Sequence, residues 1–110
     1  MATKPKFTLA LAPTFKAKVL IPIPGKAAEL VEFTFKARNR DEFKDFVDGI
    51  QTSEGQSGDV DTIMDITSGW ELEDAFDREN VERLTQNYLG AARAIIETYF
   101  AELTQARTKN

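Results

Sequence analysis

Hydrophobic and polar positions alternate with a period of two in two segments near the start of the chain, residues 15–23 and 31–37. This period is typical of strands with one buried face, and Pro24-Gly25 between the segments is a turn signal. We therefore predict an antiparallel β-hairpin. Both apolar sets occupy odd positions, so their faces coincide only if paired residue numbers have an even sum, roughly 52 or 54 from the turn. Apolar residues also alternate just before the hairpin, which predicts either a third short strand or an extended arm: Phe7, Leu9 and Leu11.

Helical spacing begins after the hairpin. Asn39, with Glu42 three residues later, has the signature of a capping box, and apolar residues follow at helical intervals from Phe43 to Ile50. The next segment, 51–58, is polar and contains glycine, which predicts a mobile loop. This pattern predicts one short amphipathic helix followed by a loop.

The second half of the chain continues as helix. Asp59 is expected to cap a second short helix that ends near Gly69, and an acidic connector follows it. Asp77 is expected to cap a single long helix that continues to about residue 107. We predict an α+β fold in a single domain, 1–110, with three regions: the β-hairpin at 6–38, two short helices and the acidic connector at 39–76, and the long C-terminal helix at 77–107.

The long helix carries more apolar surface than one neighbour would cover. Its apolar residues spread over about half of the circumference, and a straight helix of roughly 45 Å would project beyond a globule of this size. The alternative is that the two short helices fold along it and cover its apolar side. If it projects, its apolar residues form a candidate protein interface, to which two aromatic residues of the acidic connector are added: Tyr88, Ile96, Tyr99, Phe100 and Leu103, with Trp70 and Phe76.

Charge is unevenly distributed along the chain, although the net charge is only −4. Residues 1–40 hold eight basic and two acidic side chains, whereas residues 41–77 hold one basic and twelve acidic ones. The sequence pI of about 4.8 argues against extended contact with nucleic acid. Complementary patches on protein surfaces suit this distribution better. We therefore expect protein partners, including a second copy of this chain.

Two features of the hairpin and connector have alternative readings. The predicted hairpin brings four cations together on one strand face, Lys16, Lys18, Lys36 and Arg38. This face is either simply solvated or meets an acidic patch on a partner or on another copy. Trp70, the single tryptophan, is either a core residue or an interface anchor, because tryptophan is over-represented at binding hot spots.

The chain lacks the residues that most enzymes use. It contains no cysteine and no histidine, which removes thiolate nucleophiles and the commonest general base and metal ligand. The acidic run from Asp59 does not fit an EF-hand, since Met64 and Trp70 occupy the glycine and glutamate positions of that loop. Glu71 with Asp74 is an available carboxylate pair for acid-base work, although any acidic connector would supply one. We expect no cofactor, no metal and no enzymatic activity.

Nothing in the sequence indicates a membrane or export. No run of about 18 apolar residues is present, and the first residues lack the apolar segment of a secretory signal. We therefore expect a cytoplasmic protein.

Taken together, the ordered features from about Pro13 onward resemble the tail assembly chaperone family of long-tailed bacteriophages and prophages. The most specific parts are the connector GWELEDAF, residues 69–76, and the helix NYLGAARAIIETYFAEL, residues 87–103. The resemblance implies a non-enzymatic protein that coats the long tape-measure protein, helps recruit tail tube subunits in the host cytoplasm, and is absent from the mature virion. The alternatives are a structural tail or head-tail component retained in the virion, and a small enzyme or regulator that uses the acidic connector.

Overall fold

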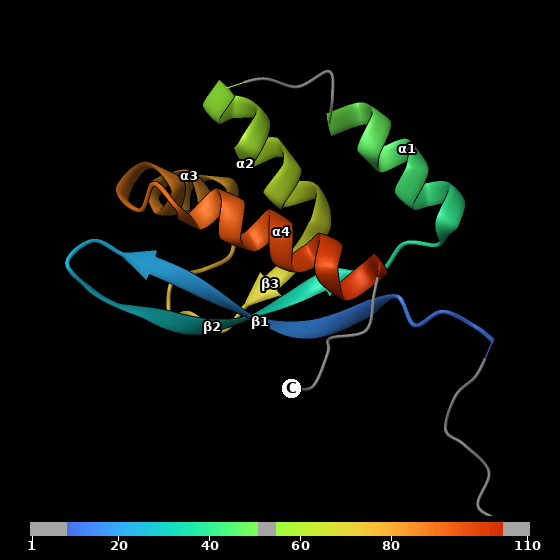
Figure 1. Cartoon of the computed structure of the whole chain (residues 1–110), viewed down its shortest axis with the longest axis horizontal. Coiled ribbons are helices and arrows are strands. Elements are labelled where there is room, and N and C mark those ends of the chain that lie inside the picture. The colour runs from blue at the N-terminus through green and yellow to red at the C-terminus, as the bar shows by residue number, and fades with distance from the viewer. Residues whose placement is uncertain (1–8, 51–54, 105–110) are drawn as a thin grey trace, which may run out of the picture.

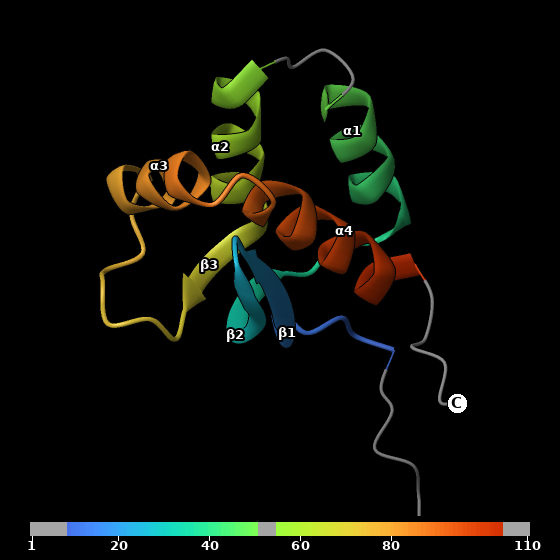
Figure 2. The ribbon, with the colours of Figure 1, turned by 60° about the vertical axis from the view of Figure 1, so that its left-hand side comes forward.

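The computed structural model describes residues 9–50 and 55–104. In this part of the chain three strands form one antiparallel sheet in the order β1-β2-β3, and the helices lie over one of its faces (Figure 1 and Figure 2). This arrangement confirms the predicted α+β class. The elements follow one another as β1 (Thr14–Ile23), β2 (Lys26–Lys36), α1 (Arg40–Ile50), α2 (Gly55–Ile66), β3 (Thr67–Trp70), α3 (Arg78–Asn87) and α4 (Ala91–Thr104).

The β1-β2 hairpin forms as predicted, but in another register. Phe15 lies opposite Phe35 and Val19 opposite Val31. The predicted registers would have placed Phe15 opposite residue 37 or 39 and are wrong, because Gly25 makes a tight turn with a positive φ of 76° and the register shifts between Ile21 and Ile23. The apolar faces still coincide, because the side-chain period of two allows only registers of this parity to bury both.

The third strand does not come from the segment before the hairpin. Residues 9–13 contain no strand, so within the described residues they form an arm, and Phe7 lies outside those residues. β3 instead follows α2 directly and pairs antiparallel with β2, with Trp70 opposite Phe33. The predicted end of the second helix near Gly69 is therefore wrong, because residues 67–70 complete the sheet. Only part of the predicted loop at 51–58 is described, and there the prediction is wrong, because α2 begins at Gly55. Asp59 therefore lies within α2 and is not its cap.

The first capping prediction is confirmed. The Asn39 side chain accepts a hydrogen bond from the Glu42 backbone N–H, and the Glu42 carboxylate accepts one from the Asn39 N–H, each at 2.9 Å. α1 therefore begins at Arg40, directly after the cap. Short-range chemistry was sufficient to predict this boundary.

The predicted single helix from 77 to 107 is wrong, because the chain breaks into α3 and α4. Asp77 does cap α3, accepting from the Asn80 N–H at 2.9 Å. The helix then stops at Tyr88, whose backbone is extended with φ −125° and ψ 97°. Gly90 follows with its Cα against the Pro22 ring, where a Cβ would lie 3.0 Å from the nearest ring carbon. This contact with the hairpin redirects the chain into α4.

One hydrophobic core lies between the sheet and the helices. The odd-numbered residues of β1 and β2 supply its floor, while α2 and α4 supply most of its cover. Its largest fully buried side chains are Tyr99, Phe33, Phe35, Ile63, Ile66, Ile95, Val19, Val60 and Val81. Within the described ranges, no helix is long and apolar enough to cross a membrane.

Candidate protein-interaction site

An aromatic cluster closes the end of the sheet where β1 begins and β2 ends. We define it by Phe15 and Phe35 from the strands, Phe43 and Phe46 from α1, and Tyr99 and Phe100 from α4. Neighbouring ring centroids in this cluster lie 5.3–6.5 Å apart, the range of favourable aromatic packing. α1 thus covers the end of α4 that would otherwise be exposed (Figure 1).

Tyr99 lies at the centre of the aromatic cluster with no exposed surface. Its hydroxyl donates to the backbone carbonyl of Lys36 at 2.7 Å and accepts from Arg38 Nη1 at 2.8 Å. Arg38 also donates to the Asp65 carboxylate at 2.8 Å and lies over the Phe46 ring, 4.4 Å from its centroid. These contacts join β2, α1, α2 and α4 through one buried hydroxyl and one arginine.

Burial raises the pKa of the Tyr99 hydroxyl above its ordinary value of 10.0, because the phenolate would lose water. The hydrogen bond and positive charge of Arg38 oppose this shift. The tyrosine is therefore neutral at physiological pH, which its donation to the Lys36 carbonyl requires.

The far end of the long helix was predicted as an interface, and the structure places these residues against the fold instead. Tyr99 is buried, while Ile96, Phe100 and Leu103 are half-buried and packed on the core. The alternative in which a short helix folds over this end is the one observed. We accordingly leave Tyr99 out of the candidate surface.

The predicted basic face is only partly assembled. The sheet face that no helix covers exposes Lys16, Lys18 and Lys36. Lys18 lies opposite Glu32 in the strand register. Arg38 does not join them, because β2 ends at Lys36; its side chain is only 15% exposed. The Arg38 guanidinium is instead hydrogen-bonded to Tyr99 and paired with Asp65.

The same open sheet face carries two leucines. Leu20 and Leu30 lie opposite each other on β1 and β2 and are 54% and 56% exposed. Sequence reasoning missed this pair, although both residues occupy polar-phase positions of the alternation.

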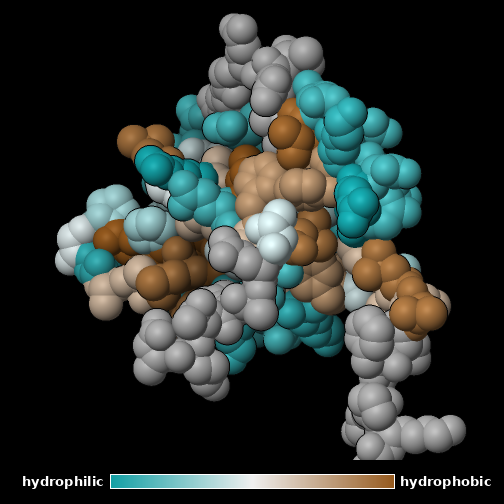
Figure 3. Space-filling model, turned by 45° about the vertical axis from the view of Figure 1, so that its right-hand side comes forward, coloured by the Kyte–Doolittle hydropathy of each residue, from teal (hydrophilic) through white to brown (hydrophobic). Residues whose placement is uncertain are grey.

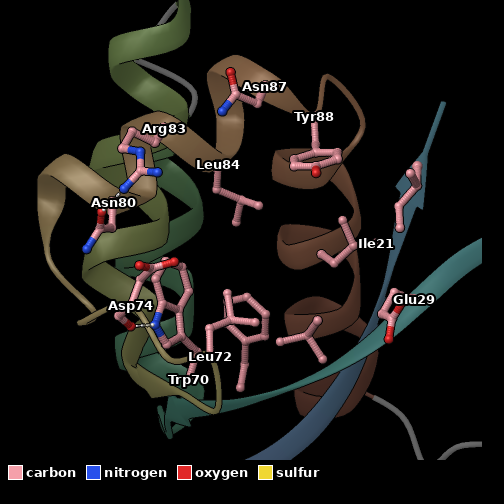
Figure 4. A pocket seen from close by; sticks show the side chains of 13 residues that line it. Ile21, Glu29, Trp70, Leu72, Asp74, Asn80, Arg83, Leu84, Asn87 and Tyr88 are labelled. Carbon is pink, nitrogen blue, oxygen red and sulfur yellow. Dashed lines mark hydrogen bonds between the residues drawn. The ribbon is translucent and has the colours of Figure 1, made fainter.

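An apolar groove opens at the other end of the sheet, beside the hairpin turn. It has a volume of about 370 Å³ and lies between the hairpin, the segment after β3, and α3 (Figure 4). Leu84 of α3 and Ile21 of β1 point into it from different sides, with Leu72 near its lower edge. The residues that line it are Ile21, Ile23, Glu29, Val31, Phe33, Trp70, Leu72, Asp74, Asn80, Arg83, Leu84, Asn87 and Tyr88.

Trp70 serves both the core and the groove. Its indole Nε1 donates to the Asp74 backbone carbonyl at 2.7 Å (Figure 4). The ring packs edge-on against Phe33 at 5.9 Å and against Phe76 at 5.1 Å, measured between centroids. Phe76 therefore supports Trp70 from outside the groove lining, and Tyr88 and Trp70 are the predicted interface residues that reach the groove.

The rim of the groove is more acidic than basic. The carboxylates of Glu29 and Asp74 are exposed there. Arg83 lies on the same rim and donates to the Asn80 side chain at 2.9 Å. An apolar floor with an acidic rim suits a partner segment that carries apolar and basic side chains.

The acidic connector has structural uses in this fold. Glu71 accepts a hydrogen bond from the Glu32 backbone N–H at 2.7 Å, which extends the pairing of β3 with β2. Two acidic residues of α2 are also paired, Asp61 with Arg78 and Asp65 with Arg38. In residues 9–50 and 55–104, no group of three or more Asp or Glu side chains could hold a metal ion.

Sequence reasoning missed Leu72 and Leu84 as groove residues. Leu72 had a signal, because it stands alone as an apolar residue in the acidic connector and is 38% exposed. Leu84 had none, since a single long helix would have presented it simply as part of an apolar stripe.

The whole chain, residues 1–110, matches the family model described as phage tail assembly chaperone. No curated protein and no solved structure matches the chain. Because the family match covers the full sequence, the chain belongs to the phage tail assembly chaperone family.

Proposed function

We propose that this phage tail assembly chaperone binds the tape-measure protein of its phage and promotes assembly of the tail tube, without catalysing a reaction. The observation that supports the proposal best is the apolar groove beside Trp70. A chaperone needs a surface that recognises apolar segments, and the described part of the chain leaves this groove open.

The groove is suited to a helical partner with an apolar stripe. A volume of about 370 Å³ accepts one or two large side chains, and helix-in-groove binding uses anchors one turn apart. Trp70 and Tyr88 supply aromatic surface of the kind enriched at binding hot spots. The carboxylates of Glu29 and Asp74 favour lysine or arginine beside the apolar anchors.

The proposal includes a place and a time of action. The protein acts in the host cytoplasm while the tail is being built, and is absent from the mature virion. The alternative, a structural tail or head-tail component, keeps the protein in the particle. Mass spectrometry of purified virions separates the two, since detection at many copies per particle would contradict the chaperone proposal.

The direct test is co-expression of this chain with the tape-measure protein of the same phage. We expect the soluble yield of the partner to rise and the two proteins to elute together from a sizing column. Leu72→Lys is expected to lower affinity by roughly tenfold or more, because a charge then enters the apolar contact.

Leu89→Lys is the matched control, because Leu89 is 88% exposed and does not line the groove. It should leave co-elution unchanged. A partner that stays insoluble beside a soluble chaperone would refute tape-measure binding, and equal effects of the two variants would refute the groove as its site.

A further inference from the structure

We propose that, before the partner binds, the N-terminal arm of a second copy of this chain occupies the apolar groove as an added strand beside β2. The arm is the segment from Lys6 to Ala12. This proposal rests on the proposed function in one respect only, that the arm controls access of the partner to the groove. The contact between the two copies does not depend on that function.

The first observation is an unpaired stretch of sheet edge. β3 pairs with β2 at Phe33–Phe35, and hydrogen bonds between Glu32 and Glu71 extend this pairing by one position. Nothing in the described residues pairs with β2 on that side from Lys26 to Leu30. Because backbone groups alternate in direction along an antiparallel strand, the N–H and C=O of Leu30 point the same way as those of Glu32, toward this empty position.

The groove lies next to that edge. Glu29 and Val31 of β2 line it together with Ile21 of β1, and Leu72 lies where the chain leaves β3. A strand added in line with β3 would therefore direct every second side chain into the groove, because strand side chains alternate between faces. Strand addition of this kind combines backbone hydrogen bonds with pockets for alternate side chains.

The arm has the sequence that such a position requires. Large apolar residues at 7, 9 and 11 alternate with threonine and alanine, and the segment lies between Pro5 and Pro13. Leu9 and Leu11 are 95% and 59% exposed, so their own chain leaves most of their surface uncovered. Figure 3 shows hydrophobic surface exposed low on the right side of this face of the molecule.

Charge favours the same pairing. Lys4 and Lys6 precede the apolar residues of the arm, and Glu29 and Asp74 lie on the groove rim. Seating the arm places ammonium groups near these carboxylates. Association should therefore weaken as salt increases, since such exposed pairs are screened.

Leu9 and Leu11 can take this position only from a second copy, because they lie too close to the start of β1 to reach their own groove. Thr14, where β1 begins, is seven residues from Ile21, or roughly 23 Å along a strand. Leu9 is five residues before Thr14 and can extend at most about 18 Å, and Leu11 less. Figure 1 shows β1 beginning at the end of the hairpin opposite the turn, whereas the groove is lined by Ile21 and Ile23 near the turn.

The test is sedimentation velocity of the full chain alone over a concentration series. We expect wild type to associate, and the double variant Leu9→Asp with Leu11→Asp to weaken association by roughly tenfold or more. Both leucines are exposed, so this variant should keep the fold, which circular dichroism checks. Leu72→Lys should weaken association from the groove side, and Leu89→Lys should not.

Cross-linking identifies the contact, because the chain has no cysteine of its own. Mixed Leu9→Cys and Leu72→Cys chains are expected to form a disulfide between one of each, and replacing Leu72→Cys by Leu89→Cys should abolish it. Wild type that stays monomeric throughout the series overturns the proposal, as does association that the double variant leaves unchanged.

These outcomes are separate from those of the proposed function. Self-association is measured without the tape-measure protein, and co-expression is scored by solubility of that partner. If association through the arm fails while the partner is still solubilised, only the arm proposal is lost. If association occurs and the partner stays insoluble, the arm contact stands and tape-measure binding is lost.

Discussion

The two ends of the sheet carry similar apolar side chains, but helices close over only one of them. At the aromatic cluster, α1 and α4 close over Phe15 and Phe35, and Tyr99 is fully buried. At the apolar groove, α3 and the hairpin leave between them a space of about 370 Å³ that Trp70 and Tyr88 help to line. Aromatic content alone therefore does not distinguish a core from a binding surface. What distinguishes them here is whether another helix covers the rings.

Polar contacts reinforce the difference. The buried hydroxyl of Tyr99 has both a donor and an acceptor partner, in Arg38 and the Lys36 carbonyl. Such a satisfied network holds one arrangement of the surrounding elements. At the groove, the Trp70 indole is satisfied within its own segment by the Asp74 carbonyl, and the ion pair that joins α3 to α2, Arg78 with Asp61, is exposed.

The largest expected effect is on the closed end. Tyr99→Ala should lower the free energy of unfolding by about 3–5 kcal/mol, because it removes a buried ring and leaves a cavity. Urea denaturation measures this loss. The same measurement on Leu72→Lys should show a change below about 1 kcal/mol, since Leu72 is partly exposed. Equal losses from the two variants would show that the ends do not differ as described.

A smaller effect isolates the hydroxyl of Tyr99. Tyr99→Phe keeps the ring and should cost about 1–3 kcal/mol at neutral pH, because the Lys36 carbonyl loses its donor. Its pH dependence gives a second signature. The pKa of Tyr99 is raised in the fold, so the folded protein keeps a proton that the unfolded chain loses above about pH 10.

Stability of the wild type should therefore fall as pH rises above about 10, and its advantage over Tyr99→Phe should shrink. Paired urea titrations of the two proteins measure this, and the other tyrosine and the lysines cancel in the comparison. If the difference in free energy of unfolding between the two proteins stays constant above about pH 10, Tyr99 ionises equally well in the folded and unfolded states.

The smallest expected effect concerns the junction that turns α3 away from α4. Gly90→Ala should lower stability by about 1 kcal/mol, because the new Cβ would lie 3.0 Å from Pro22 Cγ and the hairpin must shift. Gly49→Ala is the control, since nothing lies within 4 Å of a Cβ there and the residue is in α1. It should stabilise by about 0.5–1 kcal/mol, as alanine does in helices. Thermal unfolding that shifts both variants in the same direction would contradict the close approach at Gly90.

Predictions from the sequence succeeded where the controlling interactions are close in the chain. The hairpin with its turn at Pro24-Gly25, the Asn39 capping box and the Asp77 cap all depend on neighbours within a few residues. Predictions failed where contacts between residues distant in the sequence determine strand pairing or burial. Trp70 joins the sheet because its segment pairs with β2, and Tyr99 is buried because α1 folds back over it.

The candidate site was predictable only in part. Trp70 and Tyr88 were selected by residue type, and both line the groove. Trp70 and Tyr88 line the same groove because the chain breaks between α3 and α4. This break arises from contact of Gly90 with Pro22, 68 residues earlier in the sequence. Helical periodicity continues through this point, and a single glycine such as Gly90 is tolerated within helices, so the local signal for the break was weak.

The sequence by itself determined the family, the α+β class, the hairpin and the starts of α1 and α3, because each depends on residue order or on local periods and caps. The tertiary structure alone decided the third strand, the helix break and which aromatic residues remain accessible. The physical reason is that burial is a property of the assembled layers. Tyr99 and Tyr88 have the same chemistry, and only the helices packed around them make one a core residue and the other part of a groove.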